Sequence, residues 1–119
     1  MRRIFFSLGL ISFLFLVQTA FPATYYVKKD GNDSNDGSKW TQAFLTTTKA
    51  MDEVTSGDAV WVAKGEYKEG ATITVREGVT LYGGFDGTET KLSQRDVDNN
   101  QVIIDGENSC RCVTNLWYD

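Results

Sequence analysis

Short apolar strands that end at glycines recur through the second half of this chain, and no helix pattern lies between them. Aligning the strands on these glycines gives matching apolar positions: Val60, Val79 and Val102 in one column, and Val62, Leu81 and Ile104 in another. The offsets between copies are 19 and 23 residues, close to the ~20-residue lower end of solenoid periods. One turn cannot bury such positions alone, so turns stack and fill a common interior. The pattern is compatible with a stacked coil and excludes a doubly wound α/β sheet.

A small antiparallel sandwich is the alternative that this periodicity leaves open. Its hairpins need two-residue turns such as Asn-Gly or Asp-Gly, which the links between these strands lack. The link Arg76-Glu77-Gly78 can still close a hairpin through a three-residue bulged turn. Ile73 and Val75, between two of the aligned copies, fit a second face of the coil. The residues alone therefore leave both architectures open.

The region before these strands predicts one strand, one loop and one helix. Thr24–Lys28 is β-branched and aromatic, as strands are, and Asp30–Ser38 is dense in turn-forming residues. Thr46 is placed to cap the helix. The apolar stripe of that helix consists of Thr47, Ala50, Met51 and Val54. We expect the helix to end at Ser56-Gly57-Asp58, with Gly57 in the left-handed conformation.

The first 23 residues have the features of a secretory signal peptide. Arg2 and Arg3 precede the apolar run Ile4–Val17, which spans about 21 Å as a helix and falls short of the ~30 Å membrane core. Cleavage after Ala20 places Gln18 at the third position before the cut, and cleavage after Ala23 places Phe21 there. Neither residue is small, so the position of the cut stays open. We expect a secreted or cell-surface protein that meets the membrane only through this signal peptide.

The composition excludes several classes of function. The chain has no histidine, so it contains no Ser-His-Asp or Cys-His catalytic arrangement. Twelve basic residues against 16 acidic ones give a net charge of −4, which makes nucleic acid an unfavourable partner. Cys110 and Cys112 lie too close in the chain for an unstrained bridge, and two ligands are too few for a zinc site.

Several blocks of the chain carry a likeness to a known family. They are Tyr25–Gly37, Gly57–Tyr67, Glu77–Thr90, Gln94–Asp96 and Ile103–Gly106, with Trp40, Ala43-Phe44 and Lys49–Met51 between them. Together they resemble the N-terminal region of pectin-lyase-like, right-handed parallel β-helix proteins exported by bacteria. They are most similar to the subset found as large surface or secreted proteins in the Bacteroidetes. The resemblance covers nearly all of residues 24–119.

The resemblance implies an all-β fold, consisting of the first turns of a right-handed parallel β-helix with an N-terminal capping α-helix over the open end of the coil. The expected divisions are a signal peptide (1–23), a strand, acidic loop and capping helix (24–58), and the first β-helix turns (59–119). Family members continue for many further turns, so a truncated product is expected here. In the alternative, Leu116, Trp117 and Tyr118 fold over the opening.

Three groups of residues are candidates for chemistry, and each has a structural alternative. The loop Asp30–Asp36 offers oxygen ligands to calcium, but Thr41 stands where a calcium hand has glutamate, and Asp and Asn also form turns. Arg95, beside Asp96, is either the base of a uronate lyase or a tie that holds the loop 87–101 to the coil by bidentate hydrogen bonds. The aromatic candidates either stack on sugars or pack beneath loops: Trp61, Tyr82, Trp117 and Tyr118.

We predict no catalytic, cofactor-binding or metal-binding residue in this chain. The leading hypothesis is an exported non-catalytic β-helix scaffold segment that serves cell-surface adhesion or contacts a polysaccharide or cell-surface glycan. One alternative is the N-terminal fragment of a polysaccharide lyase or hydrolase that lacks its catalytic turns. Another is a small secreted binding domain. The first two hypotheses come from the resemblance, and the third takes the chain as a self-contained β-domain. Fold alone does not decide between them.

Overall fold

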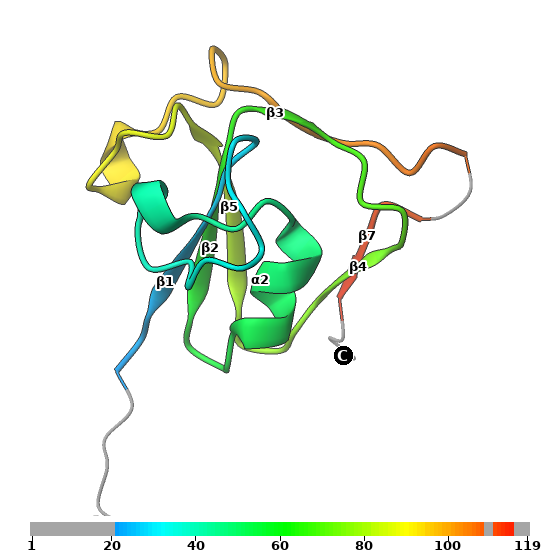
Figure 1. Ribbon diagram of the computed structural model, residues 1–119, viewed down its shortest axis with the longest axis horizontal. Helices are drawn as coiled ribbons and strands as arrows, with labels where there is room; N and C mark the ends of the chain where they lie inside the picture. Colours follow the sequence, from blue (N-terminus) through cyan, green and yellow to red (C-terminus); the bar gives the residue numbers. More distant parts are fainter. Residues whose placement is uncertain (1–20, 109–110, 116–119) are drawn as a thin grey trace, which may run out of the picture.

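The computed structural model describes residues 21–108 and 111–115, and this part is rich in strands, with a single α-helix (Figure 1). The strands are β1 (Thr24–Val27), β2 (Ala59–Ala63), β3 (Gly65–Tyr67), β4 (Ile73–Val75), β5 (Thr80–Phe85), β6 (Val102–Ile104) and β7 (Val113–Asn115). The helix is α2 (Thr47–Glu53), and two short 3-10 turns are η2 (Trp40–Gln42) and η3 (Leu92–Gln94). The predicted strand-rich class is confirmed. None of the described helices is long and apolar enough to span a membrane.

Every strand pair in the described part of the chain is parallel. β1, β2 and β5 form one sheet in that order, here called sheet A, while β3 pairs with β6 and β4 pairs with β7 (Figure 1). Each of β2, β3 and β4 therefore pairs with the strand three places further along the chain. The antiparallel sandwich is contradicted, because its hairpins would make neighbouring strands antiparallel.

The register within sheet A differs from the predicted one. Val60 pairs with Leu81, whereas the alignment on glycines matched it with Val79. The glycines used for that alignment, Gly83 and Gly84, do not end the strand, because β5 continues through them to Phe85. At this point two residues of β5 face one residue of β2, which is a β-bulge. The alignment was therefore wrong because it treated a bulge inside a strand as the end of the strand.

The third predicted copy is a strand, but it lies in a different sheet. Val102–Ile104 forms β6 and pairs with Gly65–Tyr67 of β3 instead of extending sheet A. The long segment 86–101 separates β5 from β6, whereas Lys64 alone separates β2 from β3, so an even spacing cannot hold. Val102 and Ile104 nevertheless pack against the hydrophobic core. Their predicted inward position is confirmed, and their place in a single column with Val60 is wrong.

The helix forms as predicted and is shorter than predicted. The hydroxyl oxygen of Thr46 accepts the N–H of Lys49 at 3.2 Å, which is the expected cap. The whole predicted stripe is buried: Thr47, Ala50, Met51 and Val54. α2 ends at Glu53 because Val54 adopts an extended backbone and enters the core. Gly57 has a positive φ of 98°, but it lies in the turn before β2 and does not end the helix.

The hydrophobic core lies between α2 and the sheets, and α2 contacts β1 and β4. Its buried members are Val27, Phe44, Ala50, Met51, Val54, Val60, Val62, Tyr67, Ile73 and Val79. Ile73, on β4, belongs to a different sheet from Val60, as expected for a further face of the molecule. Most of the predicted signal peptide (1–20), Cys110 and the segment 116–119 lie outside the described residues.

Candidate functional site

Aromatic side chains occupy the outer face of sheet A. Tyr26, Trp61 and Tyr82 stand in register on its three neighbouring strands. The bulge in β5 brings Phe85 to the same face, where its ring stacks on Trp61 with 4.6 Å between centroids. Trp40, from η2, lies 4.8 Å from Tyr26 and 5.7 Å from Phe85, measured between ring centroids. We call these five residues the outer aromatic cluster.

The centre of the outer aromatic cluster is packed beneath loops. Trp61 is 8% exposed, and Phe85 is fully buried. Trp40 Nε1 donates to the carbonyl oxygen of Glu89 at 2.9 Å, which fastens η2 to the loop after β5. The prediction that outward aromatic residues pack beneath loops is confirmed for Trp61. A sugar ring that stacks on an aromatic side chain needs an open aromatic face, and Trp61 does not offer one.

Arg95 holds the loop after β5 against sheet A, with a geometry that differs from the predicted one. Its Nη1 donates to the carbonyl oxygen of Gly83 at 3.4 Å, and its guanidinium lies 5.0 Å from the centroid of the Tyr82 ring. One long hydrogen bond and a cation–π contact thus replace the predicted bidentate bonds. The carbonyl oxygen of Gly84 also accepts the N–H of Asp96 at 2.7 Å. The bulge therefore anchors a long surface loop, and Arg95 has the contacts of a tie.

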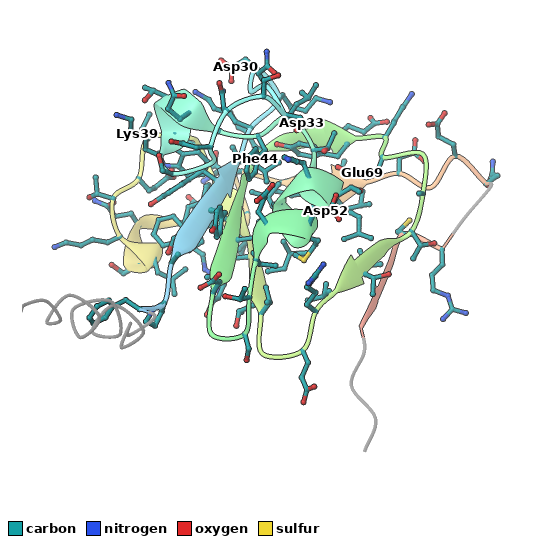
Figure 2. The ribbon with its side chains drawn as sticks, turned by 60° about the horizontal axis from the view of Figure 1, so that its bottom comes forward. Asp30, Asp33, Lys39, Phe44, Asp52 and Glu69 are labelled. Atoms are coloured by element: carbon teal, nitrogen blue, oxygen red, sulfur yellow. The ribbon has the colours of Figure 1, made fainter. Side chains whose placement is uncertain are left out.

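The acidic loop 30–36 uses its side-chain oxygens to hold turns and the start of α2 (Figure 2). The Asp33 carboxylate accepts the N–H of Leu45 at 2.8 Å, and both the N–H and the hydroxyl of Thr46 at 3.0 and 2.8 Å. Asn32 and Asp36 each accept the N–H two residues further on, at 2.8 and 2.9 Å. Among the described residues, no group of three or more acidic or cysteine side chains is arranged to hold a metal ion. The observed role of the loop is that of a turn and a helix cap.

Asp58 is the only charged side chain buried within the described part of the chain, at 6% exposure. Its Oδ1 accepts the N–H of Ala23 at 2.9 Å, and its Oδ2 accepts the N–H and the hydroxyl of Thr55 at 2.9 and 3.3 Å. The carbonyl oxygen of Ala23 in turn accepts the N–H of Ala59 at 3.0 Å. Burial raises the pKa of Asp58, but the hydrogen bonds from Thr55 and Ala23 outweigh it and hold the pKa below its usual value. Sequence reasoning missed this role, because the start of β1 is far from Asp58 in the chain.

We expect the stabilisation from Asp58 to disappear at acid pH. Because its folded pKa lies below the unfolded value of about 3.9, its contribution is present above that value and is lost as the pH falls through the folded pKa. Urea unfolding of the wild type and of Asp58→Asn should give free energies that differ by about 1–3 kcal/mol at pH 7 and converge as the carboxyl group protonates. A difference that stays constant down to about pH 2 would contradict this role.

Over residues 21–108 and 111–115, the parallel strand pairs and the one α-helix are those of a strand-rich protein built from parallel sheets. Residues 29–106 match the family model described as protein of unknown function (DUF1565), and the chain belongs to this family. The matched segment begins just after β1 and runs through the acidic loop, α2 and the strands β2 to β5 to just beyond the end of β6. No curated protein matches the chain, and no solved structure matches it. The finer likeness to pectin-lyase-like proteins stays a prediction.

Proposed function

We propose that this chain is an exported, non-catalytic scaffold segment made of the first turns of a right-handed, pectin-lyase-like parallel β-helix, and that it contacts a polysaccharide or cell-surface glycan. The strand order carries the proposal: β2, β3 and β4 are followed by β5, β6 and β7, each paired in parallel with its counterpart. A chain that returns to the same sheets in the same order winds as a coil. Right-handed winding is strongly preferred where parallel strands of one sheet are connected.

The two ends of this coil differ in a way that suits a stacked scaffold. At one end, α2 packs against β1 and β4 and contributes buried side chains to the core. At the other end, β5, β6 and β7 each have a single strand neighbour among the described residues. A strand with one neighbour has an edge where a further turn or a partner strand can pair.

Two charged side chains in the described part of the chain, Asp58 and Arg95, have roles in the fold that suit the proposed non-catalytic scaffold. Active sites bring titratable groups with perturbed pKa values together in a cleft. The Asp58 carboxylate, whose pKa is lowered, is instead enclosed by hydrogen bonds from Thr55 and Ala23. The Arg95 guanidinium lies against Tyr82 and Gly83. Both groups hold segments of the fold together.

A second candidate is the N-terminal segment of a polysaccharide lyase or hydrolase. The edges of β5, β6 and β7 that lack a strand partner within the described residues favour it over a small self-contained binding domain. Catalytic turns stacked on these edges would extend the same coil.

Export is tested by placing a charge in the apolar run 4–17. Signal peptides need an uninterrupted apolar segment, so Leu14→Asp is expected to keep the chain full-length in the cytoplasm. We expect the wild-type chain, tagged at its C-terminus and produced in a bacterium, to be found outside the cytoplasm and shortened by about 20–23 residues. Ser7→Thr, a mild change in the same run, is the matched control and should be exported. Cell fractionation and intact-mass measurement give the result, and an uncut wild-type chain in the cytoplasm contradicts the proposal.

A further inference from the structure

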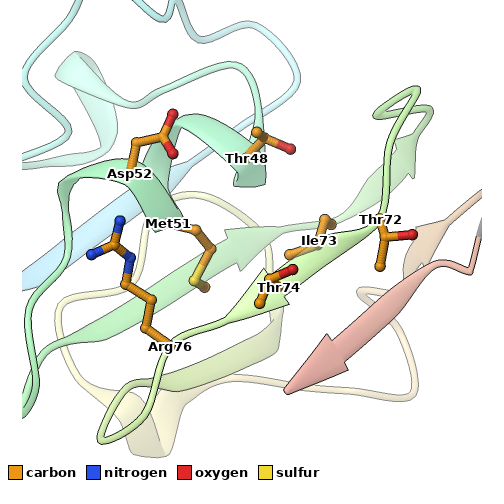
Figure 3. A pocket seen from close by; sticks show the side chains of 7 residues that line it. All are labelled: Thr48, Met51, Asp52, Thr72, Ile73, Thr74 and Arg76. Atoms are coloured by element: carbon orange, nitrogen blue, oxygen red, sulfur yellow. The ribbon is translucent and has the colours of Figure 1, made fainter. Parts of the chain in front are cut away.

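A groove of about 480 Å³ lies between α2 and β4 (Figure 3). Its volume falls within the ~300–1,000 Å³ that is usual for small-molecule sites. Met51 of α2 and Ile73 of β4 line it and are 5% and 1% exposed, so they form an apolar and well-packed floor. None of the contacts of the outer aromatic cluster, the Arg95 loop or the acidic loop involves this groove.

The rim of the groove is polar and carries both signs of charge. Asp52 stands on the helix side, and Arg76 stands just after β4. Figure 3 shows the Arg76 side chain extending from the end of the strand towards the helix. Thr72 and Thr74 add two hydroxyl groups along the strand side. The rim therefore offers a planar donor, a carboxylate acceptor and two groups that can donate or accept.

The polar side chains of the rim are not used to hold the fold together. Within the part of the chain that the structure describes, the side chains of Asp52, Arg76, Thr72 and Thr74 form neither hydrogen bonds nor ion pairs with other residues. The groove thus differs from the acidic loop and from the Arg95 loop, where the polar groups are used to hold the chain in place. Four polar side chains line the groove beside its apolar floor and remain available to a ligand.

We propose that this groove binds one or two residues of a neutral glycan. The proposal rests on the glycan contact proposed above, and it names the place of that contact and the class of sugar. Adjacent sugar hydroxyls fit the two oxygens of Asp52 and the forked donors of Arg76, and the hydroxyl groups of Thr72 and Thr74 can donate to or accept from further sugar hydroxyls. The charges of Asp52 and Arg76 offset each other, and the chain carries 16 acidic against 12 basic residues. An anionic sugar therefore gains no net attraction.

Met51 provides a direct reporter for this site. The chain has two methionines, Met1 and Met51, and only Met51 lies in the groove. With 13C-methyl-methionine labelling of the full chain, Met51→Leu assigns the Met51 signal. We expect that signal to shift and saturate with at least one of methyl glucoside, methyl galactoside, methyl mannoside and N-acetylglucosamine. The expected Kd is about 1–10 mM, as befits a small ligand on an open groove.

Variants of the rim decide whether the shift arises from the proposed contacts. Asp52→Asn and Arg76→Gln are each expected to weaken binding by about tenfold, because each removes a charge-assisted hydrogen bond to the sugar. Glu77→Gln, an exposed neighbour of Arg76 outside the groove, is the matched control and should leave the Kd unchanged. If neither rim variant weakens binding, the proposal that this groove binds a neutral glycan is contradicted. A Met51 shift that appears with galacturonate alone contradicts it as well.

A backbone amide spectrum separates the groove from the broader proposal. If neutral sugars shift amide signals outside the groove and leave the Met51 signal unchanged, the groove is not the glycan site, and the broader proposal of a glycan contact stands. If no sugar moves any signal, both the groove and the glycan contact are overturned.

Discussion

Replacing Phe85 with alanine is expected to lower the free energy of unfolding by about 3–5 kcal/mol. Phe85 is fully buried on the outer face of sheet A, where it stacks on Trp61 and lies 5.7 Å from Trp40. Truncation removes the ring from both partners and leaves a cavity that the fastened loops cannot readily close. Urea unfolding followed by tryptophan fluorescence measures the change, because two of the three tryptophans of the chain, Trp40 and Trp61, belong to this cluster.

Ile103→Ala is the matched control for Phe85→Ala. Ile103 also lies on a strand, β6, but its side chain is 50% exposed. Removing a half-exposed side chain leaves no closed cavity, so the expected loss is about 0.5–1 kcal/mol. Similar losses of unfolding free energy for the two variants would show that the outer aromatic cluster is not closely packed around Phe85.

Gly37→Ala is expected to destabilise the fold by about 2–4 kcal/mol. Gly37 has a φ of 72°, where a side chain adds backbone strain of about 1–2 kcal/mol. A Cβ at Gly37 would also lie 2.4 Å from a ring atom of Phe44, which is 1% exposed and held in the core. Relieving that overlap moves a buried ring and costs about 1–3 kcal/mol more. Chemical denaturation of the variant and of the wild type gives the difference.

Gly70→Ala separates the two causes of the Gly37 effect. Gly70 has a nearly equal φ of 77°, and a Cβ there would have no atom within 4 Å. It should therefore show the backbone strain alone, about 1–2 kcal/mol. The excess loss in Gly37→Ala measures the clash with Phe44. Equal losses at the two positions would mean that the acidic loop does not pack as tightly on the core as the structure describes.

The sequence pattern was sufficient to predict the kinds of elements in this chain and the faces that they bury. The helix cap at Thr46 and the buried stripe through Met51 depend on residues close in the chain, so spacing alone identified them. The same holds for β1 and for the loop that follows it. The outward position of Trp61 followed from strand alternation.

The pairing of the strands was beyond what spacing could determine. The bulge at Gly83 and Gly84 looks like a strand end in the sequence, and its inclusion in β5 became evident only from the pairing with β2. Gly65–Tyr67 and Val113–Asn115 are too short to stand out as strands, and each is held by a partner from another turn. The groove between α2 and β4 was missed for a similar reason. Its two sides come from segments whose proximity is a product of tertiary packing.

The backbone contacts of Ala23 give the two cleavage positions predicted for the signal peptide different consequences for the fold. A product that begins at Phe21 keeps both the hydrogen bond from Ala23 to Asp58 and the one from Ala59 to Ala23. A product that begins at Thr24 loses both and leaves a buried carboxylate with one partner fewer. If the predicted signal peptide is removed after Ala20, the product therefore keeps contacts that a cut after Ala23 would remove, and Ala23 acts as part of the folded protein.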